Sequence, residues 1–167
     1  MRSEQQANWA IDQYADTVQR ICTLHLKNQA DAEDIFQTVF LKYVTYPGSF
    51  ENQEHERAWI IRVTINACKD HLRHLFRSAT IPLEEIAEPA QPLPEDYSEV
   101  LEAVQSLPPK YRDVVYLHFY EQYSAVEIGR ILRKNVNTIY TRLDRAKKML
   151  KEKLGGDDLA EPHSEGL

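Results

Sequence analysis

The chain of 167 residues is poor in several residue types, and each scarcity excludes a class of protein. Its two cysteines, Cys22 and Cys68, are too few for a disulfide scaffold and are typical of a reducing compartment. Only five glycines are present, which together with the few alternating β-branched runs favours an α-rich fold. No run of 18 apolar residues occurs, and the first residues lack the apolar stretch of a signal peptide. We therefore expect a cytoplasmic protein without membrane insertion.

Motifs of several common enzyme mechanisms are also absent. The sequence contains no G-x-S-x-G, P-loop, H-E-x-x-H or G-x-G-x-x-G pattern. Cys68, His71 and His74 are spaced three apart, which leaves a zinc site as an alternative. However, this spacing drifts around a helix and a fourth ligand is not obvious. We predict a protein that is not an enzyme and that binds no cofactor or metal.

Charge is distributed unevenly along the chain. The net charge is −6, which taken alone argues against a nucleic-acid partner. Residues 78–98 hold five acids and no lysine or arginine, whereas residues 124–153 hold nine bases and three acids, a local charge of +6. The basic end is therefore the part suited to bind nucleic acid.

The acidic stretch also contains four prolines, which favour an extended linker over a helix or strand. Four segments are therefore predicted: a helical domain at 1–77, a linker at 78–98, a second helical domain at 99–154 and a flexible tail at 155–167. In the first domain we expect helices near 9–27, 31–44 and 57–75, with Asp31 as the N-cap of the second. In the second domain a helix over 95–106 precedes the stretch "LPPKYRDVVYLHFYEQ", where Pro109 suits a first helical turn.

A helix-turn-helix is predicted near the C-terminus. "SAVEIGRIL" has Ser124 as a cap and Glu127 three residues later, which is a capping box. After the break "RKN" comes a basic helix over 136–153 with an apolar stripe. Residues near its start are candidates to reach base edges, and its lysines suit phosphates. The candidates are Thr138, Tyr140, Thr141, Arg142, Arg145, Lys147 and Lys148. A basic solvated face on a small bundle is the plainer alternative.

A second candidate surface lies on the stretch "RAWIIRVTINACKDHLRHL", residues 57–75. One stripe at helical spacing is apolar, and we expect it to pack into a core. The other stripe combines one large ring with cations and an amide: Trp59, Arg62, Asn66, Lys69 and Arg73. Aromatic stacking with a cationic track is how single-stranded nucleic acid is held. The alternative is that the tryptophan belongs to the core and the cations only solvate a face.

The order of these parts resembles the extracytoplasmic-function (group IV) sigma factors of bacterial RNA polymerase. The likeness covers about residues 10–154 and includes "DAEDIFQTVFLKYV", the stretch at 57–75, the acidic Pro-rich linker and the helix-turn-helix. It implies an all-α fold of two helical domains, region 2 and region 4. It also implies the function of directing core polymerase to specific promoters and helping to initiate transcription.

The resemblance also implies roles for residues. In the family, region 2 binds the clamp helices of the largest polymerase subunit, and the matching positions here are Asp34, Gln37, Thr38, Phe40 and Leu41. The stripe from Trp59 to Arg73 matches the part that melts and reads the −10 element. The start of the last helix matches the reader of the −35 duplex. Further implied partners are the flap region of the polymerase, promoter DNA and an anti-sigma factor.

Two departures from the family pattern concern the helix-turn-helix. Arg133 stands where the family turn usually has glycine, and a positive φ there costs an arginine on the order of 1 kcal/mol. Tyr140 stands where the family often has a basic residue. A stand-alone helix-turn-helix regulator, which binds an operator without polymerase, is the alternative function.

Overall fold

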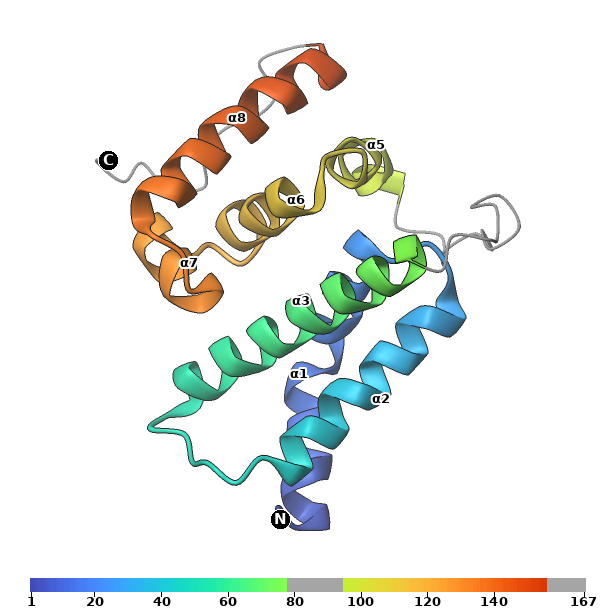
Figure 1. The fold of residues 1–167 in the computed structure, drawn as a ribbon, viewed down its shortest axis with the longest axis vertical. Coiled ribbons are helices and arrows are strands. Elements are labelled where there is room, and N and C mark those ends of the chain that lie inside the picture. The colour runs from blue at the N-terminus through green and yellow to red at the C-terminus, as the bar shows by residue number, and fades with distance from the viewer. Residues whose placement is uncertain (78–94, 156–167) are drawn as a thin grey trace. The chain divides into compact units, whose positions relative to one another are not determined.

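The structure, a computed structural model, describes residues 1–77 and 95–155 (Figure 1). Within these ranges the backbone forms helices joined by turns and loops and no strand, which confirms the predicted all-α fold. The chain divides into two compact units, Met1–Pro92 and Leu93–Leu167. Most of the predicted linker and tail lies outside the described residues. A helix already begins at Glu95, within the predicted linker.

The first unit is a bundle of three helices that contact one another pairwise (Figure 1). They are α1 (Glu4–His25), α2 (Gln29–Thr45) and α3 (Gln53–Arg77). α1 begins five residues before the predicted start at Trp9, because Ser3 forms a capping box with Gln6. The prediction that Asp31 caps α2 was wrong. Asn28 is the N-cap, and its side chain accepts a 2.8 Å hydrogen bond from the Asp31 backbone N–H.

The core of the first unit takes one apolar stripe from each helix. Ile61, Ile65 and Cys68 of α3 are at most 1% exposed, which confirms the first part of the predicted inward stripe. Its last two residues, Leu72 and Leu75, are only half-buried. On α2, Ile35 and Val39 are buried as expected. α1 contributes buried Tyr14, Val18, Ile21 and Cys22. Burial of these side chains stabilises each helix in place, at roughly 1.5–3 kcal/mol for a large aliphatic side chain.

The second unit is built around its last helix. Its elements are α5 (Glu95–Gln105), α6 (Pro109–Val115), the π-helix η1 (Tyr116–Tyr120), α7 (Ala125–Leu132) and α8 (Val136–Leu154). α8 packs on α5, α6 and α7 through four residues of the predicted stripe, which are buried: Ile139, Leu143, Ala146 and Leu150. The fifth residue of that stripe, Leu154, is only half-buried. Pro109 occupies the first turn of α6, as expected. These contacts hold α8 so that its opposite, polar side is left to solvent.

The π-helix between α6 and α7 was not predicted, because the sequence of residues 107–122 indicated only a helix that begins near Pro109. η1 continues α6 with wider turns, and Gln122 then takes a positive φ of 63°. Buried His118 supports this bend, since its Nδ1 lies 2.9 Å from the Tyr123 carbonyl oxygen. The Tyr123 N–H donates back to the Leu117 carbonyl at 2.9 Å. The bend redirects the chain into α7.

Candidate nucleic-acid interface

The predicted helix-turn-helix is present as α7, a tight turn and α8. Ser124 and Glu127 form the expected capping box at the start of α7. Arg133 adopts the left-handed conformation, with φ 56° and ψ 49°, so the cost foreseen for an arginine at this position applies. The Lys134 N–H donates to the Gly129 carbonyl at 2.9 Å, and Asn135 then caps α8.

Gly129 allows this turn to close, a role that sequence reasoning missed. A Cβ at Gly129 would lie 2.8 Å from the carbonyl oxygen of Lys134, a backbone atom that cannot rotate away. The turn therefore depends on the absence of a side chain at a buried position inside α7. The only available signal was a glycine four residues before an atypical turn.

Four of the predicted duplex-contacting residues meet in one groove. Thr138, Thr141, Arg142 and Arg145 lie at helical spacing on one side of α8 and line an open hollow of about 350 Å³. Lys110 and Tyr111 of α6 and Asn137 of α8 complete the lining. The structure thus brings two arginines, a lysine and several hydroxyl or amide groups together. Such a set can hydrogen-bond base edges and phosphate oxygens.

The other three predicted residues of α8 lie outside the lining of this groove. Tyr140 is 40% exposed but sits about 160° around the helix from Thr138, at 100° per residue. Lys147 is on the same side as Tyr140. Lys148 is exposed and lies 3.3 Å from Asp144, an exposed pair of small energetic weight. The seven predicted residues are therefore not equivalent, since only four of them line the groove.

The predicted single-strand stripe on α3 is divided by burial. Asn66 and Arg73 are exposed, and Arg62 and Lys69 are half-buried. Trp59 is only 8% exposed, so the expected exposed stacking ring is not found. Its ring packs against Tyr46 at 4.8 Å, Phe50 at 5.5 Å and Tyr43 at 6.3 Å, measured between ring centroids.

These rings form what we call the aromatic cluster: Tyr43, Tyr46, Phe50 and Trp59. The cluster forms because the loop between α2 and α3, residues 46–52, folds back over α3. Phe50 stacks on Tyr43 at an interplanar angle of 3° and on Tyr46 at 23°. A Cβ at Gly48 would lie 2.5 Å from the Tyr46 ring, so a side chain there would force that ring to shift. Trp59 thus packs beneath the loop and is not an exposed ring on which a base could stack.

A second groove, which we call the loop groove, opens beside the aromatic cluster and was not predicted. It has a volume of about 490 Å³ and combines flat rings with carboxamides. Its lining residues are Gln5, Gln6, Trp9, Tyr43, Phe50, Asn52, Gln53 and Glu56. Trp9 is 42% exposed, so this groove offers solvent the tryptophan ring that Trp59 does not. Rings and amides together suit stacking and edge recognition of an unpaired base.

Glu56, which lines this groove, connects the three helices by hydrogen bonds. Its carboxylate accepts hydrogen bonds from the hydroxyls of Tyr14 on α1, at 2.8 Å, and of Tyr43 on α2, at 3.0 Å. Burial, followed by the hydrogen bond to Glu56, raises the pKa of both tyrosines above the ordinary 10.0. Arg2 opposes the rise in the pKa of Tyr43. Both phenols therefore remain protonated donors at neutral pH.

The predicted polymerase-contacting positions lie on α2. Asp34, Gln37, Thr38 and Leu41 are exposed and share one side at helical spacing, and Leu41 is 65% exposed. The expected exposure of Phe40 is not found, because Phe40 is 7% exposed and packs on Phe36 at 4.7 Å. The remaining four residues form a polar side with one apolar residue, Leu41, at its C-terminal end.

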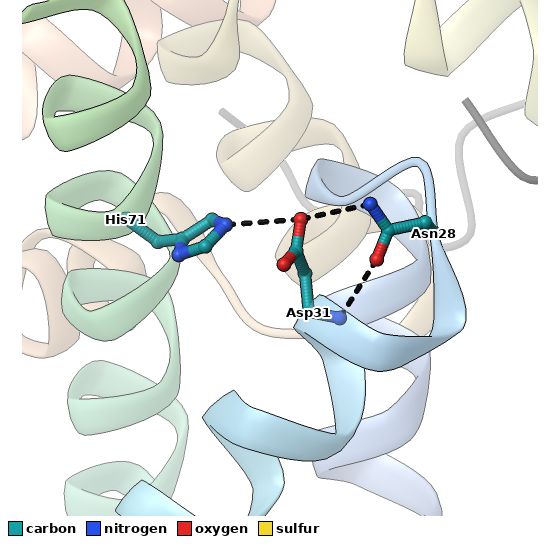
Figure 2. Close-up of polar contacts among 3 residues, drawn as sticks. All are labelled: Asn28, Asp31 and His71. Carbon is teal, nitrogen blue, oxygen red and sulfur yellow. Dashed lines mark hydrogen bonds and ion pairs between the residues drawn. The ribbon is translucent and has the colours of Figure 1, made fainter. Parts of the chain in front are cut away.

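Figure 2 shows how the start of α2 is joined to α3. Asp31 accepts a 3.0 Å hydrogen bond from the Asn28 amide, and Nε2 of His71 lies 3.1 Å from the same oxygen, Oδ2. His71 therefore faces Asp31, while Cys68 is buried and His74 is exposed. In the ranges 1–77 and 95–155, no three histidine, cysteine or acidic side chains are grouped to hold a metal ion.

Comparison with known proteins identifies both units. Residues 10–77 match the family model Sigma-70 region 2, and residues 93–150 match Sigma-70, region 4. RNA polymerase sigma factor CarQ of Myxococcus xanthus is 31% identical over 148 residues, which cover 85% of each chain. ECF RNA polymerase sigma factor SigM of Mycobacterium tuberculosis (strain H37Rv) is 30% identical over 138 residues, covering 81% of this chain and 70% of SigM.

Solved structures share the fold. The sigma factor RpoE from Bartonella quintana, in complex with the anti-sigma factor NepR, superimposes with a TM-score of 0.72 at 20% identity, covering 90% of this chain and 97% of RpoE. CnrH, in complex with the cytosolic domain of CnrY, gives a TM-score of 0.67 at 18% identity. The match covers 93% of this chain and 92% of CnrH. None of the helices described here is long and apolar enough to cross a membrane.

The two matched regions follow the two compact units, and the sequence relatives span most of both chains. The region 2 match leaves the alternative of a stand-alone helix-turn-helix regulator unsupported. The chain belongs to the extracytoplasmic-function family of RNA polymerase sigma factors, which direct core polymerase to specific promoters.

Proposed function

We propose that the second unit reads the −35 duplex through the groove on α8. The observation that carries this proposal is the convergence of Thr138, Thr141, Arg142 and Arg145 on one side of the helix that follows the tight turn. Arginine reads guanine by two parallel hydrogen bonds, and hydroxyls accept or donate to several bases. Lys147 and Lys148 would contact phosphates at the flanks, and Tyr140 is left with a flanking position.

Arg142→Ala is expected to weaken binding to the −35 element by about 1–3 kcal/mol for each lost base contact, or roughly 5- to 150-fold. The measurement is in vitro transcription with core polymerase on promoters that carry each −35 base substitution. Lys153→Ala, which removes an exposed cation from the last turn of α8, is the matched control and should weaken all promoters equally. Retention of full −35 discrimination by Arg142→Ala would remove this residue from the interface.

In the first unit, we propose that the loop groove receives an unpaired base of the −10 element. The exposed ring of Trp9 and the ring of Phe50 would stack on the base, and the amides around them would reach its edge. Arg62, Asn66, Lys69 and Arg73 would hold the strand farther along α3. Trp59 would serve by supporting the loop from below.

The exposed side of α2 is the proposed docking surface for the largest polymerase subunit. It consists of Asp34, Gln37, Thr38 and Leu41. A 65% exposed leucine next to polar residues offers a partner an apolar side chain to bury, with polar groups beside it. Phe40 would shape this surface from within the helix bundle.

Leu41→Asp is expected to weaken binding to core polymerase about 10- to 100-fold, because burying a leucine side chain contributes roughly 1.5–3 kcal/mol and an aspartate adds a desolvation cost. Fluorescence anisotropy with labelled chain and purified core measures the dissociation constant. Lys42→Asp is the control, since it changes charge by more but lies about 100° away around α2. Equal affinity of Leu41→Asp and the unaltered chain would contradict the docking surface.

Three further points complete the proposal. The chain acts as a binding subunit without an active site, and it works in the cytoplasm beside core polymerase. The flap region of the polymerase is the proposed contact of the second unit. An anti-sigma factor is its proposed regulator, which is supported by the capture of RpoE and CnrH relatives in complexes.

A further inference from the structure

The side chain of Arg2 is inserted into the aromatic cluster. Its guanidinium carbon lies 4.7 Å from the ring centroid of Tyr43, 5.0 Å from that of Phe50 and 5.7 Å from that of Tyr46. A cation over an aromatic face contributes roughly 0.5–1 kcal/mol when exposed and more when desolvated. Arg2 therefore contacts two rings of the loop, Tyr46 and Phe50, and one ring of α2, Tyr43.

Arg2 also binds the backbone where α2 ends. Nη1 donates to the carbonyl oxygens of Tyr43, at 3.1 Å, and Tyr46, at 2.7 Å, and Nη2 donates to that of Gly48 at 3.0 Å. The Arg2 backbone N–H donates to the Val44 carbonyl at 3.0 Å. The last carbonyls of a helix lack partners within it and carry partial negative charge, which favours a cation there. The planar fork of arginine can reach several carbonyls together, whereas a lysine ammonium is a single point.

These contacts reach the loop groove indirectly. Arg2 is not one of the residues that line the groove, but two of the rings it contacts, Tyr43 and Phe50, are. The loop 46–52 forms no regular secondary structure before α3 begins. Its geometry therefore depends on the ring contacts and on the hydrogen bonds from Arg2.

We propose that Arg2 is a positioning residue for −10 recognition: it fixes loop 46–52 so that the rings of Tyr43 and Phe50 keep the loop groove shaped for an unpaired base. This inference rests on the proposed role of the loop groove. Arg2 acts through the loop and does not touch the base.

The test uses the full chain with core polymerase on a promoter whose −10 region is already unpaired. The ratio of open-complex yield between the preferred and a substituted −10 base is measured, because a loss of folded protein lowers both yields and leaves the ratio unchanged. Arg2→Met is expected to lower this ratio about tenfold and to speed hydrogen exchange in residues 46–52. Arg2→Lys should restore part of the ratio, since it keeps the cation but not the fork. Arg20→Met, which removes an arginine that donates to Thr17 within α1, is the control.

Two results separate the inference from the proposal beneath it. An unchanged ratio in Arg2→Met overturns the positioning role, whatever happens to hydrogen exchange. A lowered ratio in Arg2→Met beside an unchanged ratio in Trp9→Ala and Gln6→Ala overturns the loop groove as the base site, while retaining Arg2 as the residue that positions the loop.

Discussion

Trp59→Ala is expected to lower the free energy of unfolding of the first unit by about 3–5 kcal/mol, which is a large part of the total stability of an ordinary domain. The ring is 8% exposed and contacts Tyr43, Tyr46 and Phe50, so its removal leaves a cavity beneath the loop. Promoter opening should fail as a result, but through loss of structure and not through loss of a stacking partner. Urea unfolding followed by circular dichroism measures the change.

The second tryptophan supplies the matched comparison, because the chain has only two. Trp9 is 42% exposed and meets Tyr14 edge-on at 5.9 Å, so Trp9→Ala should cost about 1 kcal/mol or less of stability while reducing permanganate reactivity of the −10 region. A chain with Trp59→Ala that unfolds at the normal urea concentration yet opens no promoter would return the stacking role to Trp59.

Glu56→Ala is the other substitution with a large expected effect. It deprives the buried hydroxyls of Tyr14 and Tyr43 of their common acceptor, at about 1–3 kcal/mol for each hydroxyl. The expected loss is therefore roughly 2–6 kcal/mol in the free energy of unfolding. Glu56→Gln keeps one acceptor oxygen and should lose less, and Glu54→Ala, an exposed acid in the same first turn of α3, should lose little.

The pH dependence of stability tests the same network. Because the folded chain raises the pKa of Tyr14 and Tyr43, it binds their protons more tightly than the unfolded chain does. The contribution of these two tyrosines to the free energy of unfolding is present in full below pH 10, the ordinary tyrosine pKa. It is lost as the pH rises through their raised pKa values. Replacing both tyrosines with phenylalanine should remove the alkaline loss and recover part of the cost of Glu56→Ala. Additive costs in that combination would show that the three groups act independently.

The features predicted correctly from the sequence are those determined by near neighbours. The capping box of Ser124 and Glu127 and the stripe from Ile139 to Leu150 each require residues within a few turns. Trp59 was misplaced because its burial depends on the loop before α3, and that loop is held by Arg2, more than forty residues away. Glu56 was missed for the same reason, since its partners Tyr14 and Tyr43 lie on other helices. Gly129 was missed for a different reason: Lys134 is near in sequence, but their close approach depends on the left-handed backbone of Arg133 between them.

Each compact unit encloses its own hydrophobic interior. We therefore expect that either unit can be replaced by the corresponding unit of a relative. On the proposed roles of the two units, a graft of residues 93–167 onto another member of the family is expected to exchange the −35 preference and to leave the −10 preference in place. On the same roles, a substitution that changes the promoter preference of one unit is expected to leave the hydrophobic core of the other unit intact.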